Sequence, residues 1–397
     1  MELDKRHKPK LLFFVTEDWY FASHRLPLAA AAVEDGYEVV LVTRVDRHLK
    51  EITRHGIRVI PTTISRSGLN PLKELGSLAE LQRIYKRERP DIVHHVALKP
   101  VIYGSLVARS LGIKGVVNAL GGFGFIYSSN RLKARLLRPG INHALKLAIG
   151  GQHTQTILQN SDDKDQIIGK GFAKPQHIHL VRGAGVNVTK YAKSPPPHSV
   201  EPLVILPSRL LRDKGVEEFA EAARLLKARG IKARFALIGK PDKENPNSIS
   251  ETEIESWVKG GILEYWGWRA DMPEVLAQSA LVCLPTYGEG LPKSLLEAAA
   301  SARAIVTTDI PGCREIVRPG VNGWLVPPRD IPALTSALEE AIGNPDLCAK
   351  YGKEGRQMVK NDFSLDYVIA ETLHIYHKLL EHKLMLPTAR IEGTSDE

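Results

Sequence analysis

The sequence predicts an α/β protein of two domains, each built around a parallel sheet. Two observations lead to this fold class. Short apolar runs rich in β-branched residues alternate with amphipathic helical segments, and this alternation stops at a run of prolines near the middle of the chain and then begins again. Strands that alternate with helices form parallel sheets with right-handed crossovers. A length of 397 residues suits two or three domains.

The first half of the chain holds the first set of alternating elements. Residues 39–43, for example, read VVLVT, a β-branched run typical of a buried strand. Strands are predicted at 11–16, 39–43, 58–61, 91–96, 116–120 and, with a weaker pattern, 156–159, and helices at 26–34, 71–89 and 101–111.

The second half repeats this order after Pro195, Pro196 and Pro197, which can continue neither a helix nor a central strand. The helix at 216–229 is amphipathic, and Gly230 is a suitable C-cap. Strands are predicted at 203–207, 235–239, 262–266, 281–285 and 304–308, and helices at 216–229, 295–302 and 364–383.

These patterns divide the chain into parts. They are an N-terminal domain at 1–193, a linker at 194–202, a C-terminal domain at 203–363, a C-terminal helix at 364–386 and a disordered tail at 387–397. Open parallel sheets bind ligands beyond the carboxyl ends of their strands, so two such sheets predict a ligand in the cleft between them.

The net charge of +9 is distributed unevenly. Residues 1–195 hold 30 Lys and Arg against 16 Asp and Glu, whereas the rest hold 24 against 29, so the halves carry +14 and −5. Between Asp91 and Asp162 there are eight Lys and Arg and no acidic residue. A basic half indicates an anionic partner, which is nucleic acid, a membrane surface or a phosphorylated substrate.

The cysteines and the apolar runs bear on location. Cys283, Cys313 and Cys348 are too few and too widely spaced for a disulfide framework or a zinc site, which favours a reducing cytoplasm. The first apolar run, 11–15, is shorter than a signal peptide requires. No run reaches the roughly 18 apolar residues of a membrane-spanning helix. We therefore expect a cytoplasmic protein that contacts membranes only peripherally.

The strongest motif is TYGEGLPKSLLE at 286–297, which follows the apolar run LVCLP and opens a helix. Gly288 and Gly290 allow a sharp turn and a close approach of backbone to ligand. The start of the helix offers unpaired N–H groups to an anion. Glu289 and Glu297 are able to hold hydroxyls of a long ligand at two points. The alternative for Glu297 is a solvated helix residue.

A second motif, PSRLLRDKGV at 207–216, also lies between a strand and a helix. Arg209 offers a planar fork and Lys214 a point charge, a combination suited to clamping a diphosphate. A charged surface turn is the alternative for this segment taken alone.

With two further segments, AGVN at 184–187 and TTDIPGCREIV at 307–317 followed by GVNG at 320–323, the chain resembles retaining glycosyltransferases of the GT-B fold, family four. The resemblance covers about 11–380 and is most specific from 203 to 330. It implies two Rossmann-like βαβ domains that face a central cleft, with the C-terminal helix crossing back to the N-terminal domain.

The resemblance also implies roles for residues. Arg209 and Lys214 would neutralise the diphosphate of a nucleotide-sugar donor, Glu289 would contact the donor sugar, and Glu297 would bind the ribose. The donor would also contact the loop residues Gly288, Gly290, Leu291 and Pro292. Such enzymes use neither a metal ion nor a cofactor, because cationic side chains and a helix N-terminus stabilise the leaving diphosphate.

Residues 16–21 (TEDWYF) and 23–27 (SHRLP) resemble a narrower subgroup, which extends sugars linked to polyprenyl diphosphate. Its most similar members transfer N-acetylgalactosamine or galactose. This resemblance implies that His24 and Arg25 contact the acceptor. A capping role is the alternative for His24.

Other acceptor contacts are expected at the end of the run DIVHHV. His94 or His95 would meet a substrate there, and Lys99 would meet a phosphate; a packing role is the alternative for a histidine at a strand end. Many relatives carry a histidine near the loop that contains residues 121–124, but this chain has GGFG there. We therefore name no general base, since the departing phosphate oxygen is able to accept the proton of the acceptor.

The region without acidic residues contains Arg131, Lys133 and Arg135 interleaved with leucines. Basic plus apolar surface is typical of segments that lie on anionic lipid. We predict that this segment docks the N-terminal domain on a membrane and binds the lipid-linked acceptor. An amphipathic core helix with a solvated basic face is the alternative.

The sequence thus predicts transfer of a hexose or N-acetylhexosamine from a UDP-sugar, with retention, to an undecaprenyl-diphosphate-linked glycan at the inner face of the plasma membrane. A transferase with a soluble acceptor and a catalytically silent nucleotide-sugar-binding protein are the alternatives. A nucleic-acid binder is disfavoured because no recognition motif or aromatic platform appears. A dehydrogenase is disfavoured because no G-x-G-x-x-G follows LLFFV.

Overall fold

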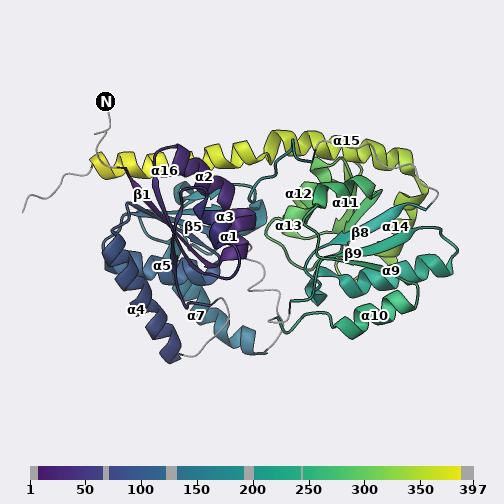
Figure 1. Ribbon diagram of the computed structural model, residues 1–397, viewed down its shortest axis with the longest axis horizontal. Helices are drawn as coiled ribbons and strands as arrows, with labels where there is room; N and C mark the ends of the chain where they lie inside the picture. Colours follow the sequence, from purple (N-terminus) through teal and green to yellow (C-terminus); the bar gives the residue numbers. More distant parts are fainter. Residues whose placement is uncertain (1–7, 66–70, 122–131, 192–200, 243–244, 386–397) are drawn as a thin grey trace, which may run out of the picture.

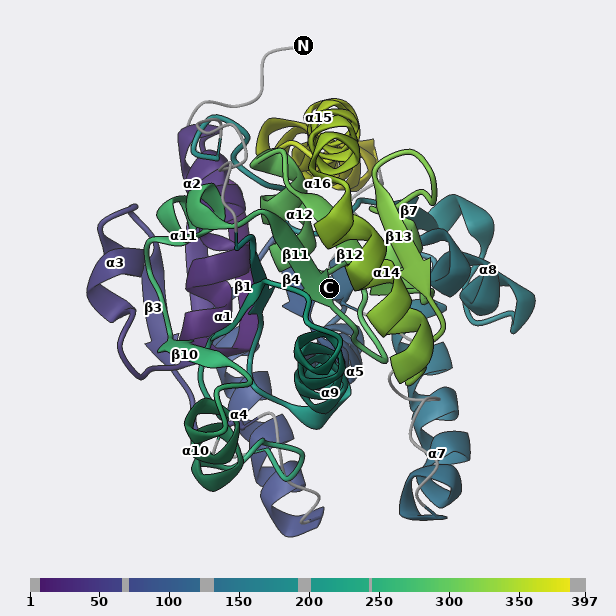
Figure 2. The same ribbon diagram turned by 90° about the vertical axis from the view of Figure 1, so that its right-hand side faces the viewer.

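The computed structural model describes residues 8–65, 71–121, 132–191, 201–242 and 245–385. Two α/β domains lie side by side, and the last two helices run along both of them (Figures 1 and 2). Most of the predicted linker at 194–202, the predicted tail at 387–397 and the first residues of the chain lie outside the described residues.

The N-terminal domain contains a seven-stranded sheet in which every pairing is parallel, in the order β3-β2-β1-β4-β5-β6-β7. Its strands are β1 (Lys10–Glu17), β2 (Glu38–Arg44), β3 (Arg58–Pro61), β4 (Ile92–Val96), β5 (Gly115–Leu120), β6 (Thr154–Leu158) and β7 (Ile178–Leu180). The strands β1, β2, β4 and β5 are buried almost throughout, as expected for a sheet that is covered on both faces.

Helices cover both faces of this sheet. They are α1 (Asp18–His24), α2 (Leu26–Glu34), α3 (Leu49–Thr53), α4 (Pro71–Glu88), α5 (Leu98–Ser110), α7 (Leu132–Ile149), α8 (Ser161–Gly169) and the 3₁₀ turn η1 (Pro175–His177). Phe13, Phe21 and Leu26 belong to the core under α1 and α2. Phe14 and Tyr85 belong to the core on the other face, under α4 and α5.

The C-terminal domain contains a six-stranded parallel sheet in the order β10-β9-β8-β11-β12-β13. The strands are β8 (Leu203–Pro207), β9 (Arg234–Ile238), β10 (Glu264–Gly267), β11 (Leu281–Leu284), β12 (Ala304–Thr308) and β13 (Gly323–Val326). The helices are η2 (Arg212–Lys214), α9 (Val216–Ala228), α10 (Glu251–Lys259), α11 (Met272–Gln278), α12 (Lys293–Ala300), α13 (Pro311–Arg314), α14 (Ile331–Gly343) and α15 (Pro345–Asp362).

The chain crosses back to the N-terminal domain after α15, as predicted. Phe363 and Ser364 lead into α16 (Leu365–Met385), which packs against α2, β4 and β5. The crossing is close to Gly185, because a Cβ on Gly185 would lie 2.7 Å from the Cα of Leu365. Tyr376 of α16 is fully buried and shares a hydrogen bond with Nδ1 of the buried His94 on β4.

The parallel α/β class and the crossing helix are confirmed, and several short elements were not predicted. The helices α3, α8, α10 and α13 have only four to nine residues, too few turns for a 3.6-residue period to be recognised. The longer helices α14 and α15, of 13 and 18 residues, were also not predicted. The strands β7 and β13 have only three and four residues and lie at sheet edges. They are strands because a neighbour pairs with them and not because of their own composition.

The contact between α16 and β4 is open to a stability test. We expect Tyr376→Phe to destabilise the protein by about 1–3 kcal/mol, because it leaves a buried nitrogen of His94 without its partner. Thermal melting measures the effect. Tyr367→Phe is the matched control on the same helix, where the ring is 42% exposed. Equal melting temperatures for the two variants would contradict a structural role for this hydrogen bond.

Candidate active site between the two sheets

The strand order identifies one edge of each sheet as a ligand site. In the N-terminal sheet the order reverses between β1 and β4, and in the C-terminal sheet between β8 and β11. Ligands of open parallel sheets bind in the crevice outside the carboxyl ends of the strands at such a point. Both strong sequence motifs follow strands at this point, since 207–216 begins at the end of β8 and 286–297 follows β11.

The loop after β8 positions Lys214. It forms the 3₁₀ turn η2, and Gly215 continues it with a φ of 72°, in the left-handed region that favours glycine. A Cβ on Gly215 would lie 2.1 Å from the carbonyl oxygen of Pro285, so only glycine fits where the two loops meet. Lys214 is 8% exposed.

The loop after β11 is held against the first loop by hydrogen bonds to one carbonyl. The carbonyl oxygen of Asp213 accepts from the hydroxyl of Thr286 at 3.0 Å and from the backbone N–H of Tyr287 at 2.9 Å. This brings Glu289 to Lys214, with 2.5 Å between Oε1 and Nζ. The predicted catalytic cation and carboxylate therefore form an ion pair in the structure.

The same loop contacts the N-terminal domain. Asn160 donates a hydrogen bond from Nδ2 to the carbonyl oxygen of Gly290 at 2.9 Å. A Cβ on Gly290 would lie 1.8 Å from the carbonyl oxygen of Gly121 at the end of β5. Leu291 packs against Gly183 of the N-terminal domain, and Gly288 has no neighbour near the place of a Cβ. The tip of the glycine loop therefore lies directly on the other domain.

The three remaining residues that were predicted to bind the donor flank this contact. Arg209 pairs with Asp242 at 2.9 Å and is partly exposed. Pro292 is the N-cap of α12, and Glu297 lies one turn into that helix. Nζ of Lys293 lies 3.6 Å from Oε1 of Glu297. The hydroxyl of Tyr191 is near the same carboxylate, and its pKa is raised by burial and, second, by the negative charge of Glu297.

The acceptor segment after β1 faces this group of residues. Lys293 donates a hydrogen bond from Nζ to the carbonyl oxygen of Ser23 at 2.8 Å, across the two domains. Burial, then the charges of Lys293 and Arg25, lower the pKa of His24 to about 3, and Arg209 adds to the effect. His24 is therefore neutral near pH 7. His24 and Arg25 thus lie beside the predicted donor site.

The structure does not bring His95 into the cleft. The residue is fully buried on the face of the sheet under α5, where the hydroxyl of Tyr85 donates to Nε2 at 3.0 Å and Nδ1 donates to Asn118 at 2.7 Å. Burial lowers its pKa to about 4. Both ring nitrogens are occupied, so the packing alternative holds for His95. His94 is equally buried and bonds Tyr376.

Two other predicted contacts lie elsewhere. Lys99, in the first turn of α5, pairs with Glu74 of α4 at 2.8 Å, so its charge is compensated within the domain. Arg131 lies outside the described residues, and Lys133 and Arg135 belong to α7, where the structure does not describe their side chains.

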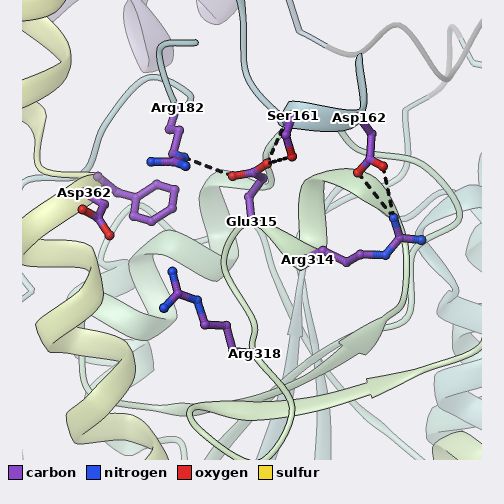
Figure 3. A pocket seen from close by; sticks show the side chains of 8 residues that line it. Ser161, Asp162, Arg182, Arg314, Glu315, Arg318 and Asp362 are labelled. Carbon is purple, nitrogen blue, oxygen red and sulfur yellow. Dashed lines mark hydrogen bonds and ion pairs between the residues drawn. The ribbon is translucent and has the colours of Figure 1, made fainter. Parts of the chain in front are cut away.

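A pocket of about 380 Å³ lies at the domain boundary next to α13. It is lined by Ser161, Asp162, Arg182, Arg314, Glu315, Arg318, Asp362 and Phe363 (Figure 3). Most of its charges pair across the boundary, since Glu315 accepts from Ser161 and from Arg182 at 3.0 Å, and Arg314 contacts Asp162. This network joins the domains, and none of the predicted site residues lines the pocket.

Sequence reasoning missed Tyr191, Lys293 and Asn160. Lys293 stands within the strongest motif and four residues before Glu297, a spacing that places both on one helix face. The local sequence around Tyr191 and Asn160 does not indicate a role at the site, because their partners, Glu297 and Gly290, are 106 and 130 positions away.

The arrangement suits an anionic ligand that carries hydroxyl groups. Arg209, Lys214 and the start of α12 offer positive charge, and Glu289 and Glu297 offer hydroxyl acceptors. Within the ranges that the structure describes, no group of three or more His, Cys, Asp or Glu side chains is arranged to hold a metal ion. In the same ranges, no helix is long and apolar enough to cross a membrane.

Comparisons with known proteins agree with this geometry. Residues 10–161 match the family model "Glycosyl transferase 4-like", and residues 201–344 match "Glycosyl transferases group 1". An N,N'-diacetylbacillosaminyl-diphospho-undecaprenol alpha-1,3-N-acetylgalactosaminyltransferase of Campylobacter jejuni is 29% identical over 84% of this chain and 89% of its own.

Two further proteins are similar over most of their length. A UDP-Gal:alpha-D-GlcNAc-diphosphoundecaprenol alpha-1,3-galactosyltransferase of Escherichia coli is 24% identical over 87% of this chain and 90% of its own. The crystal structure of Anabaena HepE in complex with UDP superimposes with a TM-score of 0.73 at 16% identity, over 94% of this chain and 100% of that one.

The close contact at Gly290 can be tested by its effect on stability. Gly290→Ala places a methyl group where the carbonyl oxygen of Gly121 lies, so we expect the domains to separate locally and the protein to lose about 1–3 kcal/mol of stability. Thermal melting and small-angle scattering measure the two effects. Gly288→Ala, two residues away in open space, should behave like the wild type. A Gly290→Ala variant with unchanged melting temperature and radius of gyration would contradict the contact.

Proposed function

The chain belongs to the family-four glycosyltransferases of the GT-B fold, and from this premise we propose that it transfers a hexose or N-acetylhexosamine from a UDP-sugar to an undecaprenyl-diphosphate-linked glycan. The observation that carries the proposal is the pairing of Lys214 with Glu289 at the cleft, where the carboxyl edges of both sheets meet. The sugar is N-acetylgalactosamine, N-acetylglucosamine or galactose.

The relatives support the acceptor. The proteins from Campylobacter jejuni and Escherichia coli are named for glycans linked to diphosphoundecaprenol, and each matches this chain over more than four fifths of its length. The segments 16–21 and 23–27, which resemble this subgroup, approach the proposed donor site through the hydrogen bond between Lys293 and Ser23.

The site supports the donor. A UDP-sugar carries a diphosphate, a ribose and a sugar in a row. Lys214 and Arg209 would hold the diphosphate, Glu297 the ribose and Glu289 the sugar, with the backbone of Gly290 and Leu291 beside it. Occupation of the site requires Lys214 and Arg209 to exchange their present carboxylate partners for phosphate oxygens.

The chemistry follows as a front-face transfer with retention. The bond between the anomeric carbon and the UDP oxygen breaks, and an acceptor hydroxyl oxygen bonds the same face of the carbon. The proton of that hydroxyl passes to the departing phosphate oxygen. Lys214, Arg209 and the N-terminus of α12 stabilise the charge that develops on the diphosphate. Since these groups supply the positive charge, we propose that no metal ion or cofactor is required.

We also propose that the enzyme lies at an anionic membrane surface. The N-terminal half carries the charge excess, and the exposed leucines of α4, α5 and α7 lie on its outer helices: Leu75, Leu106 and Leu147 are 64%, 36% and 39% exposed. Lysine and arginine near anionic lipid contribute about 1 kcal/mol each. We propose peripheral binding through α4, α5 and α7 at the inner face of the plasma membrane, where such acceptors carry their diphosphate.

A transfer assay tests the proposed function. A panel of UDP-sugars is incubated with undecaprenyl-diphosphate-linked acceptors in the presence of EDTA, and the configuration of the product is read by NMR. We expect an α-linked product without added metal. Lys214→Met should lower kcat by about 100-fold or more, the effect of removing one charge-stabilising group. Glu289→Gln, which removes the proposed carboxylate contact to the sugar, should also lower kcat strongly. Lys259→Met, which removes an exposed charge of the same domain, should retain full activity.

Three results would contradict the assignment. Full transfer by Glu289→Gln would refute the site. Transfer only to a soluble acceptor would favour the first alternative function, and UDP-sugar binding without transfer to any acceptor would favour a nucleotide-sugar-binding protein.

Vesicle sedimentation tests the membrane proposal. We expect binding to vesicles with anionic lipid to weaken when Arg131, Lys133 and Arg135 are changed to glutamine together. Neutralising the exposed Lys232, Lys259 and Lys353 of the C-terminal domain is the control with the same change in charge. Binding that is indifferent to lipid charge and to the first set of changes would contradict the proposal.

A further inference from the structure

Arg25 is a buried cation for which the described residues supply no side-chain hydrogen bond or ion pair. The residue is 4% exposed, and its Nε has no hydrogen-bond partner in the described part of the chain. No described carboxylate forms an ion pair with it. Buried charges are otherwise paired, because an unpaired charge away from water is unfavourable.

Other buried arginines of this protein find partners. Arg303, which is 1% exposed, donates from Nε to the carbonyl oxygen of Leu276 at 2.7 Å and from Nη2 to that of Ala277. Arg356, which is only half-buried, likewise donates to the carbonyl oxygen of Val188. These side chains use backbone carbonyls where no carboxylate is near. Among the described residues, the side chain of Arg25 donates neither to a carboxylate nor to a backbone carbonyl. A bound anion would supply the acceptor that is missing there.

The surroundings of Arg25 suit an anion. The residue is the N-cap of α2, a helix of nine residues at whose start the N–H groups of Leu26 and Leu28 carry partial positive charge, whereas Pro27 has no N–H. Nε2 of the buried His94 on β4 also has no hydrogen-bond partner among the described residues. Burial, and next the charge of Arg25, lowers the pKa of His94. A buried guanidinium without a partner among the described residues thus stands at the start of α2, in the segment that follows the carboxyl end of β1.

The site lies beside the cleft. Ser23, two residues before Arg25, accepts the hydrogen bond from Lys293. The pKa of His24 is lowered by burial, then by the charges of Lys293 and Arg25, and to a smaller extent by the charge of Arg209. A guanidinium binds two oxygens of one phosphate in a fork, which a lysine does not do. We propose that Arg25 binds a phosphate group of a diphosphate substrate at this edge of the cleft.

This inference rests on the proposed function, under which both substrates carry a diphosphate. Arg209 and Lys214 of the C-terminal domain are assigned to the donor. Arg25 belongs to the opposite domain and starts the helix after the acceptor segment, which favours the diphosphate of the acceptor. The experiment therefore has one arm for each source.

The acceptor arm titrates inorganic pyrophosphate into the full chain saturated with UDP, followed by calorimetry. We expect the wild type to bind and Arg25→Gln to bind at least about tenfold more weakly. Arg25→Lys keeps the charge without the fork and should be intermediate. Arg54→Gln, which removes an exposed charge of the same domain, should bind like the wild type. Circular dichroism confirms that each variant is folded.

The donor arm titrates UDP alone into the same variants. If Arg25→Gln weakens UDP binding about tenfold and Arg54→Gln does not, the phosphate group belongs to the donor. If Arg25→Gln and Arg25→Lys match the wild type in both arms, or if the wild type binds no pyrophosphate and the variants bind UDP equally, the proposal is wrong. Neither arm needs catalysis, so a chain that binds pyrophosphate through Arg25 but transfers no sugar would refute only the proposed function.

Discussion

The approach of two backbones at Gly290 governs the rest of the site. There is no room for a Cβ between this residue and the carbonyl oxygen of Gly121, so the loop that follows β11 lies directly on the end of β5. Asn160 fixes the contact with a hydrogen bond to the carbonyl of Gly290. Because the loop is held from both domains, Glu289 has a defined position next to Lys214. A side chain at position 290 would separate the two domains at this contact.

Charge is divided between the two sides of this contact. On the C-terminal side, Lys214 and Arg209 are each paired with a carboxylate, and these pairs keep the cations in place when no substrate is bound. On the N-terminal side, no carboxylate of the described residues forms an ion pair with Arg25. The network around Glu315 also joins the domains, so their boundary is held by charged contacts next to α13 and by the close backbone contact at Gly290. Substrate phosphates would enter a site in which positive charge is already oriented.

The fold and the donor loops were predictable from sequence because their signals are local. Buried parallel strands are continuous apolar runs, and the segments around Lys214 and Glu289 combine glycine, charge and helix start within a dozen residues. The acceptor side was less predictable. His94 and His95 end a strand in the same way as functional residues do, but alternation places them on opposite faces of the sheet, where Tyr376 and Tyr85 bind them. Tertiary packing alone decides which partners these histidines have. It also decides that Lys293 donates a hydrogen bond to the carbonyl oxygen of Ser23.

Determining a crystal structure of the protein with bound UDP would test most directly the claim that Arg209, Lys214 and Glu297 form the donor site, because it locates the ligand without relying on turnover. The account predicts the diphosphate between Arg209 and Lys214, the ribose hydroxyls on Glu297, and the pair between Lys214 and Glu289 opened by the phosphate. UDP bound in the pocket of Arg182, Arg314 and Arg318 on the other side of α13, with Lys214 still paired to Glu289, would contradict it.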